Sequence, residues 1–352
     1  MTSIVVTVGP NSINPKTLKS LLKAGAKSFR INLSHSDQES LHEYFEILNK
    51  VGINPAIDTQ GPQLRVSDTN LPNNIPLGQK IKLLFKKEST LNEKGLYILL
   101  NHPEAIEQIS TGDVMKVDFD GLAIEITKIE NNHTCEALIV SSGSILINRA
   151  VDINTKSLEL STLTEFDKYA IDYAISKGST EVYASFISTA SQARFVKELI
   201  GNDICLISKV ETALGVSNIK EIIEFSDKIL LDRGDLSREI TIPCVPIAVF
   251  NILKLAKNKS EVFIATNVLD SMMKSNLPSR AEISDIFNHL AAGASGIVLA
   301  AEVAIGKNPV SSTAFLNYLI KLFNNYENGF HGIGRIDKPP KDLIGEELYN
   351  WL

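Results

Sequence analysis

The chain has 352 residues, of which 22% are charged and 44% apolar, the composition of an ordinary soluble globular protein. Its net charge of −6, with Lys and Arg scattered along the chain, argues against nucleic acid or an anionic membrane surface as a partner. The three cysteines are odd in number and lack metal-ligand spacing, which predicts free thiols in a reducing compartment.

The amino terminus, MTSIVVTVGPNS, reads as a first strand. Its apolar run is short, no basic segment precedes it, and no small-residue cleavage pattern follows it, so a signal peptide is not indicated. Elsewhere no segment approaches the ~20 apolar residues of a membrane span. We therefore expect a cytoplasmic protein without a membrane partner.

Short β-rich apolar runs alternate with helical patterns along most of the chain, as in βα units around a parallel sheet. Amphipathic stretches between the runs, several with a capping residue before and Gly after, predict helices. Eight strands with intervening helices favour an α/β fold of the (β/α)8, or TIM barrel, type. The predicted strands cover residues 3–8, 28–34, 55–59, 181–186, 204–210, 228–232, 261–266 and 296–300.

The connection after the third strand is too long for a plain loop. Strand-like segments lie at 80–87, 96–100, 114–130 and 133–148, with Asp-Gly and Asn-Asn turn signals between them. We expect a small all-β domain over 67–149, inserted after the third strand as a mobile lid. The barrel then covers 1–66 and 150–326, and a C-terminal tail with one helical pattern at 342–352 covers 327–352.

Polar and charged side chains gather at the carboxyl ends of the predicted strands, where such barrels carry catalytic residues. Each acid taken alone is more often a solvated or salt-bridged loop residue, so the signal lies in the agreement of several strand ends. They are Arg30, Asn32, Ser34 and His35 after the second strand, Asp58, Thr59 and Arg65 after the third, Lys209 and Glu211 after the fifth, Asp232 and Asp235 after the sixth, Thr266 after the seventh and Glu302 after the eighth.

Two of these acids predict a metal site. Glu211 and Asp235 follow adjacent strands and offer the hard oxygen ligands that Mg²⁺ or Mn²⁺ takes. No Cys or His pair in the sequence competes for a softer metal. Arg30 and Lys209 face the same predicted mouth, so a metal and two fixed cations would balance a substrate with carboxylate and phosphate groups.

Eight segments resemble, in order and spacing, the successive motifs of the pyruvate kinase family. The similarity covers residues 3–66 and 160–325, and that family has a β-domain inserted after the third strand. Single motifs such as RGD are weak signals, whereas eight in order are specific. The segments are VVTVGP, FRINLSHSD, DTQGPQLR, YASFI, LISKVE, DRGDL, IATNVLDSMMKSNLPSRAEISDI and AEVAIGKNPV.

The resemblance implies transfer of the phosphoryl group of phosphoenolpyruvate to ADP, giving pyruvate and ATP. It implies Mg²⁺ or Mn²⁺ as cofactor and K⁺ as a candidate second ion. The residues it assigns are Lys209, Arg30 and Thr266 to catalysis, Glu211 and Asp235 to the divalent metal, Asn32, Ser34, Asp58 and Thr59 to potassium, and Asn32, His35, Arg65 and Gly234 to binding, with His35 and Arg65 at nucleotide phosphates and the Gly234 backbone at the substrate carboxylate.

Some positions depart from the family's pattern. Asp232 stands where a small residue normally precedes the arginine of RGD, and Ala301 and Val303 stand where Gly and Thr are expected. Gln63 stands where Glu accompanies potassium dependence and Lys accompanies independence, so that dependence stays open. We expect a short form without the family's carboxyl-terminal domain, with a homodimer as a candidate assembly.

Two other functions stay open. The first is an enzyme that handles phosphoenolpyruvate or pyruvate with a different phosphoryl acceptor or with lyase- or aldolase-type chemistry. The second is a non-catalytic binding protein. The preserved set Arg30, Lys209, Glu211, Asp235 and Thr266 argues against the binding protein, because a scaffold places no demand on a buried cluster of charges.

Overall fold

The computed structural model describes residues 2–72, 75–86, 95–117, 122–153, 158–327 and 337–352. The chain divides into two compact units. The barrel unit combines Met1–Gln60 with Glu165–Leu352, and the β unit is Gly61–Thr164. The β unit is wider at both ends than the predicted domain over 67–149, and it interrupts the barrel in the chain order after the third barrel strand, as the sequence predicts.

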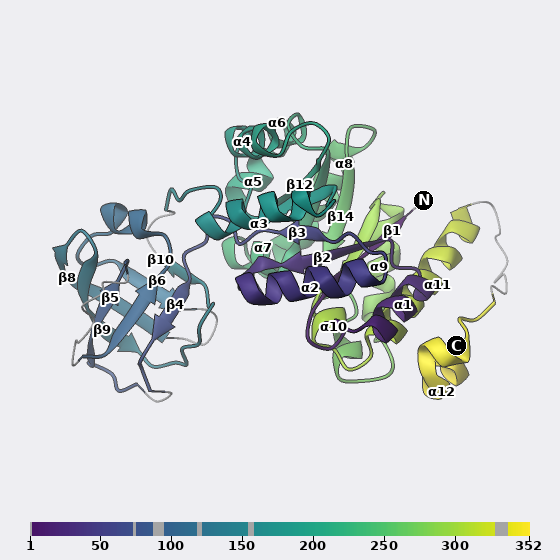
Figure 1. Cartoon of the computed structure of the whole chain (residues 1–352), viewed down its shortest axis with the longest axis horizontal. Helices are drawn as coiled ribbons and strands as arrows, with labels where there is room; N and C mark the ends of the chain where they lie inside the picture. Colours follow the sequence, from purple (N-terminus) through teal and green to yellow (C-terminus); the bar gives the residue numbers. More distant parts are fainter. Residues whose placement is uncertain (1, 73–74, 87–94, 118–121, 154–157, 328–336) are drawn as a thin grey trace. The chain divides into compact units, whose positions relative to one another are not determined.

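The barrel unit contains a closed barrel of parallel strands with helices on its outside (Figure 1). Strands that follow one another along the unit are neighbours in the barrel, and the last strand pairs with the first. All eight predicted barrel strands are present, so the TIM-barrel prediction is confirmed. They are β1 (Ser3–Val8), β2 (Ser28–Asn32), β3 (Ala56–Asp58), β11 (Glu181–Ala184), β12 (Cys205–Val210), β13 (Lys228–Asp232), β14 (Glu261–Ala265) and β15 (Gly296–Leu299).

Local sequence sets where several helices begin. Thr189 and Ser279 each form a capping box with the residue three positions on, which satisfies backbone groups at the helix start. None of the described helices combines the length and apolarity that a membrane crossing needs. The helices are α1 (Pro15–Ala24), α2 (Gln38–Lys50), α3 (Glu165–Ser176), α4 (Ala190–Ile200), α5 (Ala213–Ser217), α6 (Ile219–Ile223), α7 (Arg233–Glu239), α8 (Val245–Ala256), α9 (Arg280–Ala291), α10 (Ala301–Ala304), α11 (Pro309–Glu327) and α12 (Lys341–Trp351).

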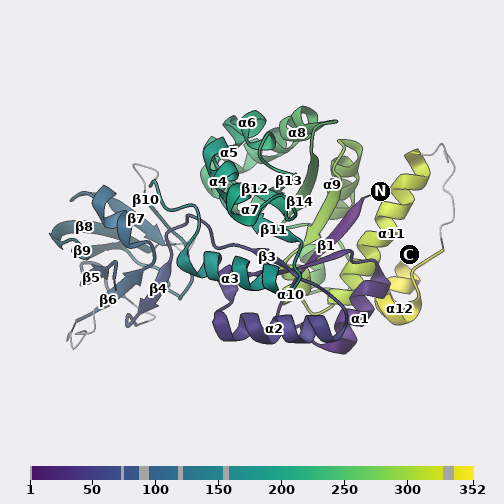
Figure 2. The same cartoon turned by 45° about the horizontal axis from the view of Figure 1, so that its top comes forward.

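The last helix, α12, packs against α11 on the outside of the barrel unit. Helix α11 lies beside both α1 and α12 (Figure 2). Ile344 and Leu348 of α12 are buried, and the ring of Trp351 lies 6.3 Å from that of Phe315 in α11. The helical pattern predicted at 342–352 is therefore a helix that buries its apolar residues against the barrel unit.

Apolar side chains from neighbouring strands fill the inside of the barrel. Phe263 of β14 belongs to this core cluster, which also contains Ala56, Ile207, Leu230 and Val298. The ring fits because the neighbouring strand carries Gly296, where a built Cβ would lie 2.1 Å from two ring atoms of Phe263. Gly296 therefore leaves the space that Phe263 occupies.

The loop after β14 has an unusual backbone. Thr266 and Asn267 both have positive φ, +64° and +52°, which is a true outlier for a β-branched residue such as Thr. Arg233 at the start of α7 donates to the carbonyl oxygens of Thr266 at 2.6 Å and of Asn267 at 3.0 Å. Arg233 is itself held by the Asp285 carboxylate at 2.5 Å and by His289 at 2.9 Å. These contacts hold the carbonyl groups of Thr266 and Asn267, the two residues with positive φ.

Glu302 of α10 fixes the amide side of the same loop. Its carboxylate is buried and accepts from the backbone N–H groups of Val268 and Leu269 at 3.1 Å each. A third N–H, that of Ala300, donates to the other carboxylate oxygen at 2.9 Å. The strand-end acid predicted from the sequence is thus a backbone anchor, and it shapes the turn that carries Thr266.

The β unit is built on one seven-stranded sheet in the order β10-β7-β8-β9-β5-β6-β4. Every strand-like segment predicted in this region contains a strand. The predicted Asp-Gly turn at 120–121 lies outside the described residues. The strands are β4 (Val66–Thr69), β5 (Lys80–Leu84), β6 (Tyr97–Leu100), β7 (Val114–Val117), β8 (Leu122–Asn131), β9 (Thr134–Ser141) and β10 (Val151–Ile153).

Substituting Gly296→Ala should destabilise the protein by about 1–3 kcal/mol, because the new methyl group overlaps the Phe263 ring and the core must shift. Urea unfolding followed by circular dichroism measures this change. The double variant Gly296→Ala/Phe263→Leu should be less destabilised than the sum of the two single variants, because the smaller side chain leaves room. Strict additivity would contradict the packing assigned to Gly296.

Substituting Glu302→Gln should cost about 1.5–3 kcal/mol of unfolding free energy, because an amide replaces a buried charge that accepts three backbone N–H groups. Hydrogen exchange should also become faster at the amides of Val268 and Leu269. The exposed Glu43→Gln in α2 is the matched control and should change neither quantity. Unchanged exchange in Glu302→Gln would argue against the anchor.

Candidate active site

The Lys209 ammonium lies between two buried carboxylates. Its Nζ is 3.0 Å from Asp58 Oδ1 and 3.0 Å from Glu211 Oε1, and it donates to Ser185 Oγ at 2.9 Å. Burial alone would lower the pKa of Lys209, but the carboxylates of Asp58 and Glu211 outweigh it and raise that pKa above its ordinary value. Lys209 is therefore a fixed positive charge at the end of β12.

A second buried cation shares Asp58 with Lys209. Arg30 Nη1 lies 2.9 Å from Asp58 Oδ2, so one carboxylate bridges the two cations. Arg30 and Asp58 lie on paired strands: in the pair β2–β3, Arg30 is opposite Ala56 and Asn32 is opposite Asp58. Arg30 is therefore one diagonal step from Asp58. Arg30 Nε also donates to Thr7 Oγ1 of β1 at 2.8 Å, and the guanidinium carbon lies 5.4 Å from the ring centroid of Tyr183. These contacts hold the Arg30 guanidinium in one orientation.

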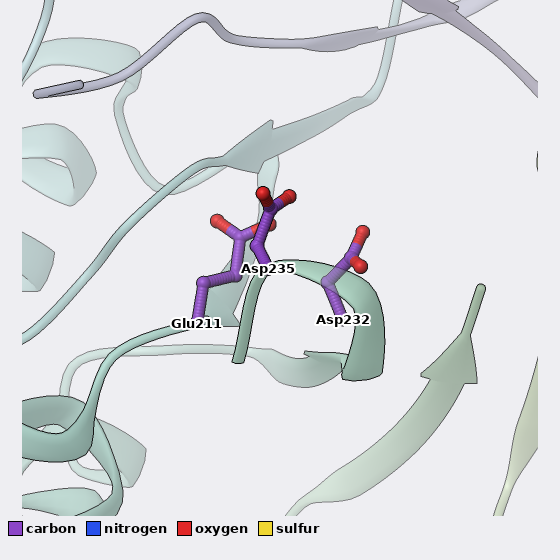
Figure 3. A group of neighbouring side chains, drawn as sticks. All are labelled: Glu211, Asp232 and Asp235. Carbon is purple, nitrogen blue, oxygen red and sulfur yellow. The ribbon is translucent and has the colours of Figure 1, made fainter. Parts of the chain in front are cut away.

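Three carboxylates gather beside this pair of cations. Glu211 follows β12, Asp232 ends β13, and Asp235 lies in α7. Each contributes one oxygen to a group in which all the oxygens lie within 4.8 Å of one another. Figure 3 shows the three carboxyl groups pointing to the same side, one from the segment after β12 and two from the turn between β13 and α7. Arg238 Nη1 is 3.8 Å from Asp235 Oδ1.

The surroundings of the Glu211 carboxylate indicate that these three acids suit a cation. Its Oε2 accepts from the Phe186 N–H at 2.7 Å, whereas Oε1 is buried, lies 3.0 Å from Lys209 Nζ and takes part in no hydrogen bond of good geometry among the described residues. Burial raises the pKa of Glu211, Lys209 lowers it, and Asp235 and Asp232 raise it further, so that pKa is above the ordinary value. Clustered carboxylate oxygens that repel one another fit a hard divalent cation such as Mg²⁺ or Mn²⁺.

Thr266 links the strained loop to the acids. Its hydroxyl has two acceptors within hydrogen-bond distance, the Ala265 carbonyl at 2.7 Å and Asp232 Oδ1 at 3.0 Å, and its Oγ1 accepts from the Gly234 N–H at 2.8 Å. The Gly234 amide, which the family resemblance assigns to a substrate carboxylate, is thus directed at the Thr266 side chain. The structure brings Thr266, Gly234 and Asp232 together at the ends of β13 and β14.

The predicted potassium residues lie on adjacent chain segments after β2 and β3. Asn32 Oδ1 accepts from the Ser34 N–H at 2.9 Å, and both oxygens of Asp58 face cations. Thr59 Oγ1 accepts from the Ser185 N–H at 2.9 Å. Of these residues, Asp58 is the one that contacts Arg30 and Lys209, whereas Asn32 binds the Ser34 amide and Thr59 binds Ser185.

The two predicted nucleotide-contact residues belong to different units. His35 ends a short 3-10 turn, Leu33–His35, in the barrel unit. Arg65 belongs to the β unit, where its Nη1 donates to the Asn148 carbonyl at 2.8 Å. Gln63, also in the β unit, is buried, and its carbonyl accepts from the Asn101 side chain at 3.0 Å.

Three residues that support the charged group were assigned no role from the sequence. Ser185 Oγ donates to the Thr59 carbonyl at 2.6 Å and accepts from Lys209. Phe186 has a φ of +57°, and its amide holds Glu211. Thr7 holds Arg30. Ser185 and Phe186 directly follow β11, so the rule that sites lie at carboxyl ends of strands could have found both.

The other departures from the family's pattern lie in α10. Val303 is fully buried and Ala301 is half-buried, and their neighbour Ala304 packs so closely on Gly9 that a Cβ built there would lie 2.7 Å from the Ala304 Cβ. Small and apolar residues therefore fit this helix where it packs on the first βα turn.

Comparisons with known proteins agree with the fold. The family model for the pyruvate kinase barrel domain matches residues 1–313. Pyruvate kinase 1 of Candida glabrata is 31% identical over 327 residues, which cover 88% of this chain and 65% of that protein. The pyruvate kinase of Sporosarcina psychrophila is 32% identical over 324 residues, 88% of this chain and 55% of that protein. The chain thus spans less than two thirds of the length of these relatives. By its barrel, its strand-end residues and this match, the chain belongs to the pyruvate kinase family.

Proposed function

We propose that this protein transfers the phosphoryl group of phosphoenolpyruvate to ADP, giving pyruvate and ATP. The observation that carries the proposal is the buried arrangement of Lys209 between Asp58 and Glu211, with Arg30 on the other side of Asp58. Phosphoryl transfer needs positioning and charge neutralisation more than it needs covalent help. An arrangement of fixed cations beside carboxylates that fit a metal meets this need.

Lys209 and Arg30 would act on the phosphoryl group. Both side chains are buried, so their charges are poorly screened by water and already oriented before the substrate arrives. The Lys209 ammonium would offset negative charge on the phosphoryl oxygens and then on the enolate that remains. The Arg30 guanidinium, held by Asp58 and Thr7, would fix the direction of the phosphate.

Glu211 and Asp235 would hold the divalent ion. Mg²⁺ or Mn²⁺, when bound, would supply Lewis-acid neutralisation of substrate oxygens. The Phe186 amide keeps Glu211 in place, since it binds Oε2 and leaves Oε1 on the side of Lys209. Asn32, Ser34, Asp58 and Thr59 are the proposed residues for K⁺, whose requirement is left open by Gln63.

Thr266 would serve the second half of the reaction, protonation of the enolate. Its hydroxyl is held by the Gly234 amide and by Asp232, so its position is defined in the resting protein. A proton would pass through this hydroxyl and water to the enolate carbon. His35 and Arg65 are the proposed contacts to the nucleotide phosphates.

The position of Asp232 favours a second candidate function. A buried carboxylate beside Thr266 adds negative charge where the family resemblance places the substrate carboxylate. The enolate chemistry could then serve a different phosphoryl acceptor or a carbon–carbon bond reaction.

A coupled assay separates these candidates. Pyruvate formation from phosphoenolpyruvate and ADP is followed with Mg²⁺, with and without K⁺, beside metal-dependent exchange of the pyruvate methyl protons. We expect turnover in the coupled assay, and the K⁺ comparison then decides the role of Gln63. Methyl exchange without phosphoryl transfer would favour the second candidate, and the absence of both would contradict an enzymatic role for this site.

Substituting Lys209→Met should abolish phosphoryl transfer to ADP in the coupled assay, because the phosphoryl group loses its buried counter-charge. The same change should lower the unfolding free energy by about 3–5 kcal/mol, since Asp58 and Glu211 lose a shared cation. Lys209→Arg keeps the charge and is the matched control for stability. Normal turnover in folded Lys209→Met would remove the proposed role.

A further inference from the structure

We propose that Asp285 and His289 of α9 are positioning residues for enolate protonation, and that they act on Thr266 through the guanidinium of Arg233. The inference deepens the proposed function and rests on it, because it concerns the residue that would deliver the proton. Both side chains bind Arg233, and Arg233 in turn binds the turn that contains Thr266. Their loss should therefore slow protonation of the enolate and leave phosphoryl transfer intact.

The Arg233 guanidinium connects α9 with the turn after β14. Its Nη2 donates to the carbonyl oxygens of Thr266 at 2.6 Å and of Asn267 at 3.0 Å, the two residues of this turn with positive φ. Its Nη1 donates to Asp285 Oδ2 at 2.5 Å and lies 2.9 Å from His289 Nε2. A guanidinium is planar and its donors have fixed directions, so the side chains that hold it also set where the two carbonyl groups lie.

Asp285 gives Arg233 a charged partner that does not depend on the substrate. Burial alone would raise the pKa of Asp285, but His289 and Arg233 outweigh it and lower that pKa to about 2. The carboxylate is therefore ionised at neutral pH. Its other oxygen, Oδ1, lies 3.1 Å from His289 Nε2, one helical turn further along α9.

His289 is a buried polar side chain that the catalytic steps do not use. Its Nε2 faces Arg233 and Asp285, whereas its Nδ1 forms no hydrogen bond among the described residues. A buried polar atom without a partner costs free energy, so an apolar side chain would be more stable at this position. The contacts of Nε2 are what explain an imidazole here, because they add a second side chain that holds the guanidinium.

The contacts of Arg233 are separate from those of the cations proposed for phosphoryl transfer. Lys209 and Arg30 both pair with Asp58, whereas the Arg233 guanidinium binds the turn after β14 and side chains of α9. Loosening that guanidinium should therefore move the Thr266 hydroxyl and leave the two buried cations in place.

The Gly234 amide reports the position of the Thr266 hydroxyl without any substrate. It lies in the first turn of α7, where backbone N–H groups have no partner within the helix, and it donates to Thr266 Oγ1 at 2.8 Å. If α9 positions the turn through Arg233, a weakened network should open this hydrogen bond and make hydrogen exchange of the Gly234 amide faster.

The test compares the full-length protein with Asp285→Asn, His289→Ala and the exposed control Asp172→Asn in α3, each checked for folding by circular dichroism. Rapid quench measures ATP formed in the first turnover of phosphoenolpyruvate and ADP. Nuclear magnetic resonance measures deuterium uptake at the pyruvate methyl group with Mg²⁺, and hydrogen exchange of the Gly234 amide. Asp285→Asn should slow deuterium uptake about tenfold or more, speed exchange at Gly234, and leave ATP formation within about twofold. His289→Ala should act in the same direction.

A double variant tests whether the effect passes through Thr266. In a Thr266→Ala background the hydroxyl is already absent, so adding Asp285→Asn should not slow deuterium uptake any further. An additive loss would contradict the inference, because Asp285 would then act by another route.

The outcomes separate this inference from the proposed function. Slower deuterium uptake with unchanged ATP formation, and with Asp172→Asn like the unaltered chain, would support the inference. Unchanged uptake in folded Asp285→Asn and His289→Ala would overturn it, and so would an equal loss of both rates. If the unaltered chain exchanges methyl protons but forms no ATP, the proposed acceptor is wrong, and the exchange rates still decide the inference. If the unaltered chain does neither, both are wrong.

Discussion

The ion pairs of Lys209 are the constraint on which the rest of the site depends. A buried ammonium is stable only with its carboxylates in place, and breaking such a pair typically costs about 3–5 kcal/mol. Asp58 lies in β3, before the β unit in the sequence, whereas Lys209 lies in β12, after the β unit, and Glu211 directly follows β12. The charged group therefore ties together two parts of the barrel that are far apart in sequence, and Arg30 joins β2 to them through the same Asp58 carboxylate.

The strained backbone after two of the barrel strands positions polar groups beside the same charged residues. Phe186 after β11 and Thr266 after β14 have positive φ, and neither residue type adopts that conformation readily. At Phe186 the result is an amide directed at Glu211, and at Thr266 it is a hydroxyl between Gly234 and Asp232. The strain persists because hydrogen bonds from Arg233 and to Glu302 hold the second turn on both sides. Rigid positioning of polar groups is what phosphoryl transfer and enolate chemistry both need.

Much of the fold could be predicted, because the period of apolar residues and the length of each run depend on local sequence. The eight barrel strands and the strands of the β unit follow from this signal. The boundaries of the β unit do not follow from this signal, because the composition of the sequence does not change at Gly61–Gln63 or in the residues after 149. Contacts such as Ser185 with Thr59, or Asp232 with Thr266, join different strands, so they depend on the register of the closed barrel and cannot be read from local sequence.

The hydrogen bond from the Gln60 amide to Asp167, 2.7 Å long, joins the two points at which the β unit leaves and re-enters the barrel unit. The two residues are 107 positions apart, so an unstructured connection would carry the full entropy of closing a long loop before β3 could pair with β11. A β unit that folds first shortens that effective loop. The refolding rate of the barrel would then depend in part on how quickly the inserted sheet forms, although none of the described strands of that sheet belongs to the barrel.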